Sequence, residues 1–134
     1  ILNLLMDLQE KYHITYLFIS HNLAVVKRVC SRVVVMYLGK VMEYGSVDKI
    51  FKNPAHPYTQ ALMNAVFDTD IDCPRERKRL QGEVPSPINP PPGCRFCGRC
   101  PEEQPCCSQG EPPLVEIEHD HFAACFLHAR QGEG

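Results

Sequence analysis

Cysteines and prolines crowd into the second half of this chain and set it apart from the first half. Six of the 8 cysteines fall between residues 94 and 125, and the run VPSPINPPPG at 84–93 stands directly before them. Proline fixes φ and removes an amide donor, so this run predicts an extended, semi-rigid connector. The cysteine segment holds few large apolar residues, and clustered thiols can supply its folding energy by binding a metal or by pairing as disulfides. The chain therefore divides into two unlike parts.

Charge and hydropathy exclude several classes of protein. The 14 Lys and Arg residues nearly balance the 16 Asp and Glu residues, so the chain lacks the positive field that gathers nucleic acid, and we expect no nucleic-acid partner. The longest apolar stretch, at 33–38, is far shorter than the ~20 residues of a spanning helix, and no basic-then-apolar leader opens the chain. We therefore expect a soluble, unexported protein whose thiols are reduced.

The chain opens with a helical pattern that has no start signal. Apolar residues at positions 1, 4, 5 and 8 share one helical face, and no capping residue precedes them. We therefore interpret the chain as one that begins inside a helix and expect it to be the C-terminal part of something longer. An apolar run at 14–19 then predicts a buried parallel strand.

Helical and β-rich patterns continue to alternate after this strand. Asn22 is the expected N-cap of a helix, and residues 33–37 and 41–44 predict two strands that pair as a hairpin. Ser46 is expected to cap a helix at 47–52. This alternation predicts the α/β class for the first half.

His21 is the candidate chemical residue of the first half. It follows the predicted strand, and the carboxyl ends of strands in open α/β sheets are where ligands bind. An imidazole there can donate a hydrogen bond to a ligand or polarise it. Position alone favours the simpler interpretation, a histidine that satisfies backbone groups at the end of a strand.

Two segments resemble the C-terminal part of the ATP-binding subunits of oligopeptide and dipeptide ABC importers. They are TYLFISHNLAVV at 15–26 and RVVVMYLGKVMEYGSVDKIFKNPAHPYTQALMNAV at 32–66. Ser20-His21-Asn22 matches the switch-histidine motif of ABC ATPases, which implies that His21 contacts the γ-phosphate of ATP and orients the hydrolytic water. The sequence NPAHPYT at 53–59 is similar to the His-Pro-Tyr signature of peptide and nickel importers. Together the two motifs favour the catalytic interpretation of His21.

The His-Pro-Tyr motif is expected to be structural. The residue before a proline avoids helical angles, so Asn53-Pro54 ends one helix and Pro57 suits the first turn of the next. We expect His56 and Tyr58 to shape the turn between these two helices. The chain contains no Gly-x-x-x-x-Gly-Lys-Ser/Thr loop, no ABC signature and no acidic strand end for magnesium. It is therefore not expected to hydrolyse ATP alone.

Reduced, clustered thiols predict a metal site in the second half. The spacing Cys94-x-x-Cys97-x-x-Cys100-Pro101 partly echoes the bacterial ferredoxin run, and zinc could use any two cysteine pairs. The stretch PSPINPPPGCRFCGRCPEEQPCC and the later HFAAC resemble the C-terminal extension of the peptide-importer ATPases, in which four cysteines can bind a [4Fe-4S] cluster. The resemblance implies the ligands Cys94, Cys100, Cys107 and Cys125.

Several alternatives remain open at this metal site. Cys97 and Cys106 are additions to the family pattern, and either could replace a neighbouring ligand, Cys106 for Cys107 in particular. Zinc, or no metal at all, are the alternatives to the iron-sulfur cluster. His119, His121 and His128 are interpreted as surface or supporting residues rather than ligands.

The resemblance implies an organisation and a set of partners. Residues 1–67 would complete an ABC-type P-loop ATPase domain, 68–93 would form a proline-rich linker, and 94–134 a small, irregular, metal-binding extension. The full-length protein would bind ATP and Mg at the cytoplasmic face of the membrane. Its partners would be a second ATP-binding subunit, two transmembrane permease subunits and, through them, an extracytoplasmic peptide-binding protein. A metal-binding interaction module without an ATPase role, or an electron carrier, is the alternative.

Overall fold

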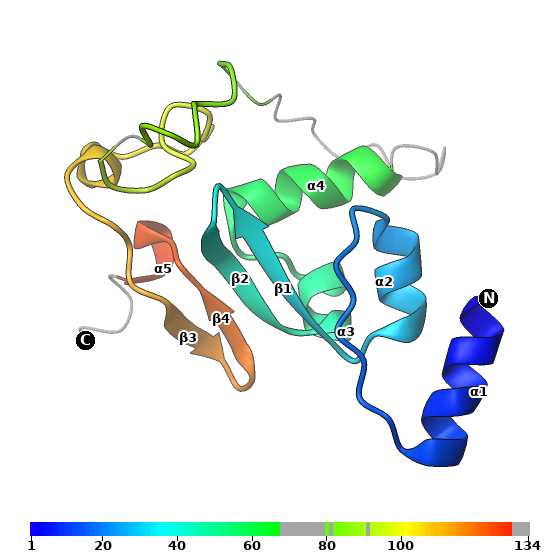
Figure 1. Ribbon diagram of the computed structural model, residues 1–134. Helices are drawn as coiled ribbons and strands as arrows, with labels where there is room; N and C mark the ends of the chain where they lie inside the picture. Colours follow the sequence, from blue (N-terminus) through cyan, green and yellow to red (C-terminus); the bar gives the residue numbers. More distant parts are fainter. Residues whose placement is uncertain (68–79, 81, 91, 130–134) are drawn as a thin grey trace.

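The computed structural model describes residues 1–67, 80, 82–90 and 92–129. The first part contains the helices α1 (Leu2–Tyr12), α2 (Leu23–Val29), α3 (Val47–Lys52) and α4 (Pro57–Phe67) and the strands β1 (Arg32–Tyr37) and β2 (Lys40–Ser46). The second part contains a 3-10 helix, η1 (Pro105–Ser108), the strands β3 (Val115–Glu118) and β4 (His121–Ala123), and the helix α5 (Phe126–Ala129). Figure 1 shows these elements in chain order.

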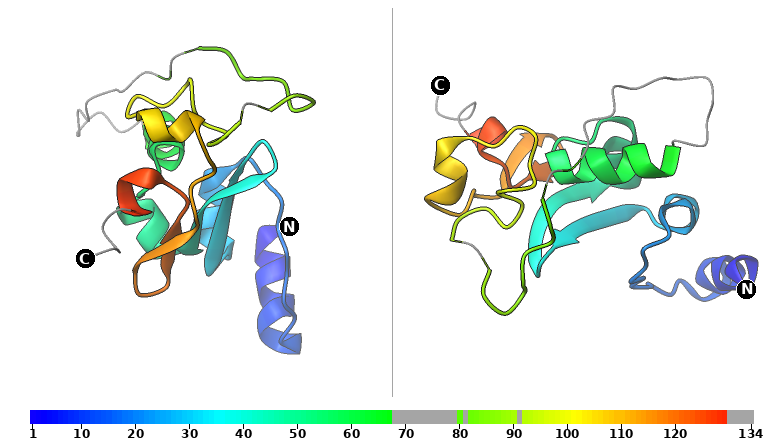
Figure 2. Two further views of the ribbon diagram at one scale, coloured as in Figure 1. Left: turned by 90° about the vertical axis from the view of Figure 1, so that its left-hand side faces the viewer. Right: turned by 90° about the horizontal axis from the view of Figure 1, so that it is seen from above.

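One antiparallel sheet draws strands from both parts of the chain. Its order is β1-β2-β4-β3, so β4 pairs with β2 and places Gly45 opposite His121. In both Figure 1 and Figure 2, the β3-β4 hairpin lies beside β2, and α1 lies at the opposite end of the molecule from the cysteine-bearing segment. The sequence predicted an irregular extension here. Instead, the cysteine-rich part contributes two strands to the sheet of the first part, so it is only partly irregular.

Local sequence signals place the elements of the first part as predicted. Asn22 Oδ1 accepts the N–H groups of Ala24 and Val25 at 3.1 and 3.3 Å, which caps α2. The Ser46 hydroxyl accepts the N–H of Lys49 at 3.4 Å, which caps α3. The hairpin of β1 and β2 and the start of α4 at Pro57 also agree with the prediction.

The buried parallel strand predicted at 14–19 is wrong for the described structure. These residues belong to no strand, and the side chains of Leu17 and Ile19 are 91% and 95% exposed. A parallel strand needs hydrogen-bonded neighbours and cover on both faces, and the sheet formed by the described residues is antiparallel throughout. The mixture of helices and antiparallel sheet is compatible with the C-terminal part of an α/β ATPase.

Two hydrophobic clusters stabilise this arrangement. The first joins α2, α3 and α4 to β1, and its fully buried centre is Ile50. The second combines residues from the two parts of the chain: Tyr37, Met42, Cys94, Phe96 and Cys107. The cysteine segment is thus packed against the hairpin. Within the described ranges, every helix is too short or too polar to span a lipid bilayer.

Candidate functional site

The turn between α3 and α4 carries the His-Pro-Tyr motif and is held by a buried carboxylate. Glu43 in β2 is fully buried. Its Oε1 accepts the backbone N–H of Ala55 at 2.9 Å, and its Oε2 accepts the N–H of His56 at 2.9 Å. Both donors stand just before α4, so the carboxylate also faces the positive end of that helix.

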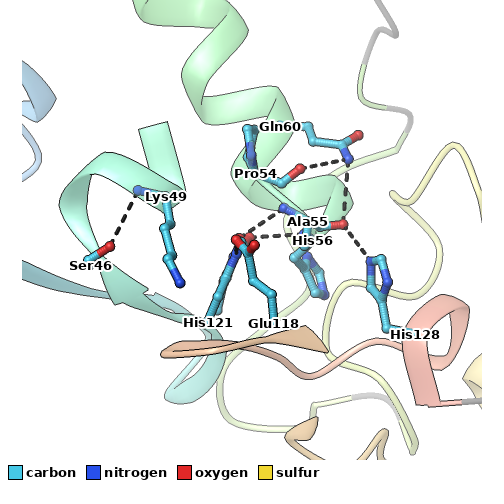
Figure 3. Close-up of polar contacts among 10 residues, drawn as sticks. Ser46, Lys49, Pro54, Ala55, His56, Gln60, Glu118, His121 and His128 are labelled. Carbon is cyan, nitrogen blue, oxygen red and sulfur yellow. Dashed lines mark hydrogen bonds and ion pairs between the residues drawn. The ribbon is translucent and has the colours of Figure 1, made fainter. Parts of the chain in front are cut away.

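A histidine of the second part completes this buried carboxylate site. His121 in β4 is fully buried, and its Nε2 lies 2.6 Å from Glu43 Oε1. Its Nδ1 lies 3.1 Å from Glu118 Oε1, so each ring nitrogen has a carboxylate neighbour. Figure 3 shows His121 reaching toward the turn that carries His56. His121 is therefore a supporting residue, as predicted, but it lies in the interior rather than at the surface.

A second histidine contacts the opposite side of the same turn. His128 Nε2 lies 3.1 Å from the carbonyl oxygen of Ala55 (Figure 3). Gln60 Nε2 donates to the carbonyl oxygen of Pro54 at 3.1 Å. The His-Pro-Tyr turn is thus contacted by β2 and, from the far end of the sequence, by β4 and α5.

His56 is the buried member of the motif and has one satisfied nitrogen. Its side chain is 1% exposed, and its Nδ1 accepts the backbone N–H of Tyr58 at 3.0 Å. This bond shapes the turn as the sequence predicted. Burial, with a smaller contribution from His128, lowers the pKa of His56 to about 4. The imidazole is therefore neutral, and its other nitrogen, Nε2, has no hydrogen-bond partner among the described residues.

Five cysteines line one cavity beside this histidine. The cavity is small and partly open to solvent, and its wall includes His56, Phe96 and Phe126. The five cysteines are Cys94, Cys97, Cys100, Cys107 and Cys125. All four residues of the predicted ligand set are thus brought to one place from segments that are 31 residues apart at the extremes, 125 − 94. Cys106 is absent from the lining.

Hydrogen bonds divide the cysteines into two groups. The sulfurs of Cys100 and Cys107 each accept a backbone N–H at 3.4 Å, from Glu102 and from Gln104 respectively. By contrast, Cys97 Sγ donates to Glu103 Oε1 at 2.9 Å, and Cys106 Sγ donates to Gln104 Oε1 at 3.7 Å. Backbone N–H groups aimed at sulfur favour a sulfur that carries negative charge.

The thiols are protonated in the absence of a cation. Burial, and then the hydrogen bond to Glu103, raise the pKa of Cys97 to about 12. Burial chiefly raises the pKa of Cys100 and of Cys125 to about 11, and it raises the pKa values of Cys94 and Cys107 as well. Neighbouring cysteines add to the increases at Cys97, Cys100, Cys107 and Cys125, and Glu103 adds to the increase at Cys94. A metal would have to displace these protons on binding.

The cavity is not arranged around a single metal ion. Among the residues that the structure describes, no three His, Cys, Asp or Glu side chains stand close enough together to hold one. The predicted iron-sulfur and zinc sites therefore find no ready coordination shell here. Cysteine sulfur remains the donor type that both metals prefer.

His21 lies outside the cysteine cavity and stays a prediction. Its side chain is exposed, and it stands between Ser20, whose Oγ accepts the Asn22 N–H at 3.0 Å, and the cap residue Asn22 itself. The loop conformation before α2 is thus held by local hydrogen bonds. Nothing in the described part of the chain brings a phosphate-binding group beside His21.

Sequence reasoning missed Glu43 as a site residue. Its only signal was a carboxylate within an otherwise apolar strand pattern, at a position that alternation assigns to the buried face. Its partner His121 lies 78 residues away. No local pattern links the two.

Comparison with known proteins places the chain in a family. The model for the oligopeptide/dipeptide transporter C-terminal region matches residues 42–107, which include the His-Pro-Tyr turn and three of the four predicted ligands. A putative peptide import ATP-binding protein of Brucella ovis is 48% identical over 126 residues, which are 94% of this chain and 40% of that protein. An oligopeptide transport ATP-binding protein of Bacillus subtilis is 48% identical over 131 residues, 96% of this chain and 40% of that protein.

A third relative has the same relation to the chain. A dipeptide transport ATP-binding protein of Escherichia coli is 49% identical over 126 residues, which are 94% of this chain and 37% of that protein. The chain spans about two fifths of the length of these curated relatives. The chain therefore belongs to the family of oligopeptide and dipeptide transport ATP-binding subunits and corresponds to their C-terminal region.

Proposed function

We propose that this chain is part of the ATP-hydrolysing subunit that powers oligopeptide or dipeptide import across the cytoplasmic membrane. The observation that carries this proposal is the match over residues 42–107, together with near 50% identity to proteins named as peptide transport ATP-binding subunits. The subunit would act at the cytoplasmic face of the membrane. It would pair with a second ATP-binding subunit, and both would drive two permease subunits that receive peptide from an extracytoplasmic binding protein.

Within this function, His21 would act on the γ-phosphate of ATP. ATP and Mg would be bound by groups that this sequence does not contain, because it has no phosphate-binding loop. The exposed imidazole of His21 would donate to the γ-phosphate and orient the attacking water. Its setting supports this role, since the hydrogen bonds of Ser20 and Asn22 hold the loop and leave the His21 ring accessible.

ATP hydrolysis by the complete transporter tests this assignment. In the complete gene product assembled with its permeases, His21→Ala should lower the hydrolysis rate at least tenfold while ATP still binds. His119→Ala replaces another exposed histidine, in the second part of the chain, and is the matched control that should leave the rate unchanged. Full hydrolysis by the His21 variant would overturn the assignment.

The cysteine cavity would hold a [4Fe-4S] cluster on Cys94, Cys100, Cys107 and Cys125. Support comes from the lining of one cavity by all four cysteines and from the backbone N–H groups that donate to Cys100 and Cys107. Sulfurs spread around an empty space suit a cluster better than a single ion, and zinc is the alternative occupant. The cluster would link the cysteine-bearing segments to one another and would supply one-electron redox chemistry. The cysteines of this chain would hold it.

Metal and acid-labile sulfide analysis of the anaerobically purified, complete gene product tests the cluster. Four iron and four sulfide per chain are expected, and Cys100→Ser should lose both together. Cys106→Ser is the matched control, because Cys106 does not line the cavity and should keep full iron content. One zinc ion per chain without sulfide would show that the cysteines bind zinc and not a cluster. A protein without metal would contradict both the cluster and the zinc site.

A further inference from the structure

His56 carries a buried hydrogen-bond donor without an acceptor. Its Nδ1 accepts the N–H of Tyr58 and is therefore unprotonated, so the proton of the neutral ring is on Nε2. Nε2 is buried and has no partner among the described residues. A buried donor left without an acceptor is rare in folded proteins and calls for an explanation.

The ring of His56 cannot turn to satisfy this donor elsewhere. The ring centroid of Phe96 lies 5.9 Å from that of His56, and Phe96 is itself fully buried. The Glu43 carboxylate holds the His56 backbone N–H, and the Tyr58 N–H holds Nδ1. Three separate contacts thus fix the direction of Nε2.

The cavity that His56 lines is rich in cysteine. Five cysteines contribute to its wall, together with Glu102, Gln104 and the apolar residues Pro57, Phe96, Pro112, Phe126 and Leu127. No sulfur accepts from Nε2 in the described structure, because Nε2 has no partner. An occupant that bound the cysteines and brought its own acceptor would meet this donor.

We propose that His56 Nε2–H donates a hydrogen bond to an inorganic sulfide of the iron-sulfur group held by the cysteine cavity. This inference rests on the proposed cluster site. A single zinc ion would bring cysteine thiolates but no inorganic sulfide, whereas a cluster brings sulfide into the cavity. His56 would then be a positioning residue that connects the His-Pro-Tyr turn to the redox properties of the cluster.

The direction of the effect follows from charge. Reduction adds negative charge to the cluster, and an N–H directed at its sulfur stabilises the reduced form more than the oxidised form. His56→Phe keeps the ring and removes the donor, so the reduction potential should shift to more negative values. His56→Gln keeps an N–H near the same position and should restore much of the wild-type potential.

The experiment measures potentials of the complete gene product after iron and sulfide have been counted. His128→Phe is the matched control, because His128 contacts the same turn through Ala55 but does not line the cavity. Its potential should match that of the wild type. A negative shift in His56→Phe, restored in His56→Gln and absent in His128→Phe, is the expected result.

A second measurement reads the hydrogen bond directly in the wild type. Pulsed EPR of the reduced cluster in protein labelled with ¹⁵N-histidine should show a hyperfine coupling to a histidine nitrogen, and His56→Gln assigns that coupling to His56 if the coupling disappears there. Full iron and sulfide with an unchanged potential and no histidine coupling would overturn the role of His56 and leave the cluster standing. Zinc without sulfide would overturn both the cluster and the role of His56. A protein without any metal would also overturn the metal site itself.

Discussion

Glu43 is a single carboxylate that satisfies three donors, the N–H groups of Ala55 and His56 and the ring of His121. In Glu43→Gln, one acceptor oxygen becomes an NH₂ group that faces a donor in either orientation. Leaving a buried donor without its acceptor in this way costs roughly 1–3 kcal/mol. We therefore expect the opening free energy of the turn to fall by about that amount, measured by native-state hydrogen exchange at Ala55 and His56.

The control at the residue scale is a carboxylate of the same type at the surface. Glu111 forms a pair with Lys40 at 3.2 Å, and its side chain is 55% exposed. Glu111→Gln should change the same opening free energy by less than ~1 kcal/mol. Equal effects of the two substitutions would show that Glu43 is not the residue that holds the turn.

At the scale of elements, the attachment of the β3-β4 hairpin to β2 depends on close approach at Gly45. A Cβ at this position would lie 2.8 Å from the carbonyl oxygen of Asp120 and 3.3 Å from the Cα of His121. Both are backbone atoms, so Gly45→Ala should force β4 away from β2. We expect faster hydrogen exchange in β4 and a loss of about 1–3 kcal/mol, as for overpacking elsewhere.

Gly110→Ala is the matched control for this element. Nothing lies within 4 Å of a Cβ at Gly110, and its φ lies outside the left-handed region. This substitution should leave the exchange of β4 unchanged. Slow exchange of β4 in Gly45→Ala would contradict the close-approach explanation.

The same elements show which parts of the fold the sequence could predict. Asn22, Ser46 and Pro57 act on backbone groups a few residues away, so α2, α3 and α4 were readable from local patterns. The run at 14–19 was misassigned because a buried strand requires partners that local periodicity does not contain. The pairing of β2 with β4 and of Glu43 with His121 depends on contacts across 78 residues, for which no short-range signal exists.

The candidate site, like the fold, has parts that the sequence could predict and parts that it could not. Cys94, Cys100, Cys107 and Cys125, the ligands that family resemblance implied, line one cavity together with Cys97, and their role as ligands stays a prediction. The orphaned Nε2 of His56 could not be read from the sequence, because it depends on the packing of Phe96 against the turn. Whether a buried polar atom finds a hydrogen-bond partner depends on tertiary packing, whereas the spacing of the cysteines can be read directly from the sequence.

At the scale of the whole molecule, two connections join the parts of the chain, the shared sheet and the cysteine cavity. Truncation after residue 93 removes both, and it leaves Glu43 buried without His121 and exposes Tyr37 and Met42, which pack against the cysteine segment. Removing the proposed cluster from the intact protein with a chelator would affect the cavity alone. We therefore expect β2 to lose its slow hydrogen exchange on truncation and to keep it after chelation.

The two treatments thereby separate the contributions of hydrogen bonding and metal binding. After chelation, exchange should accelerate at residues 94–108, where the cysteines would lose the proposed cluster. β4 should stay paired, because its bonds to β2 and the contact of His121 with Glu43 involve no metal. Equal loss of protection in β2 after chelation and after truncation would show that the metal, rather than the sheet, holds the cysteine-rich part against the rest. In that case the contact between Glu43 and His121 would form only because the cysteine cavity holds the two parts of the chain together. The contact alone would be too weak to keep them in place.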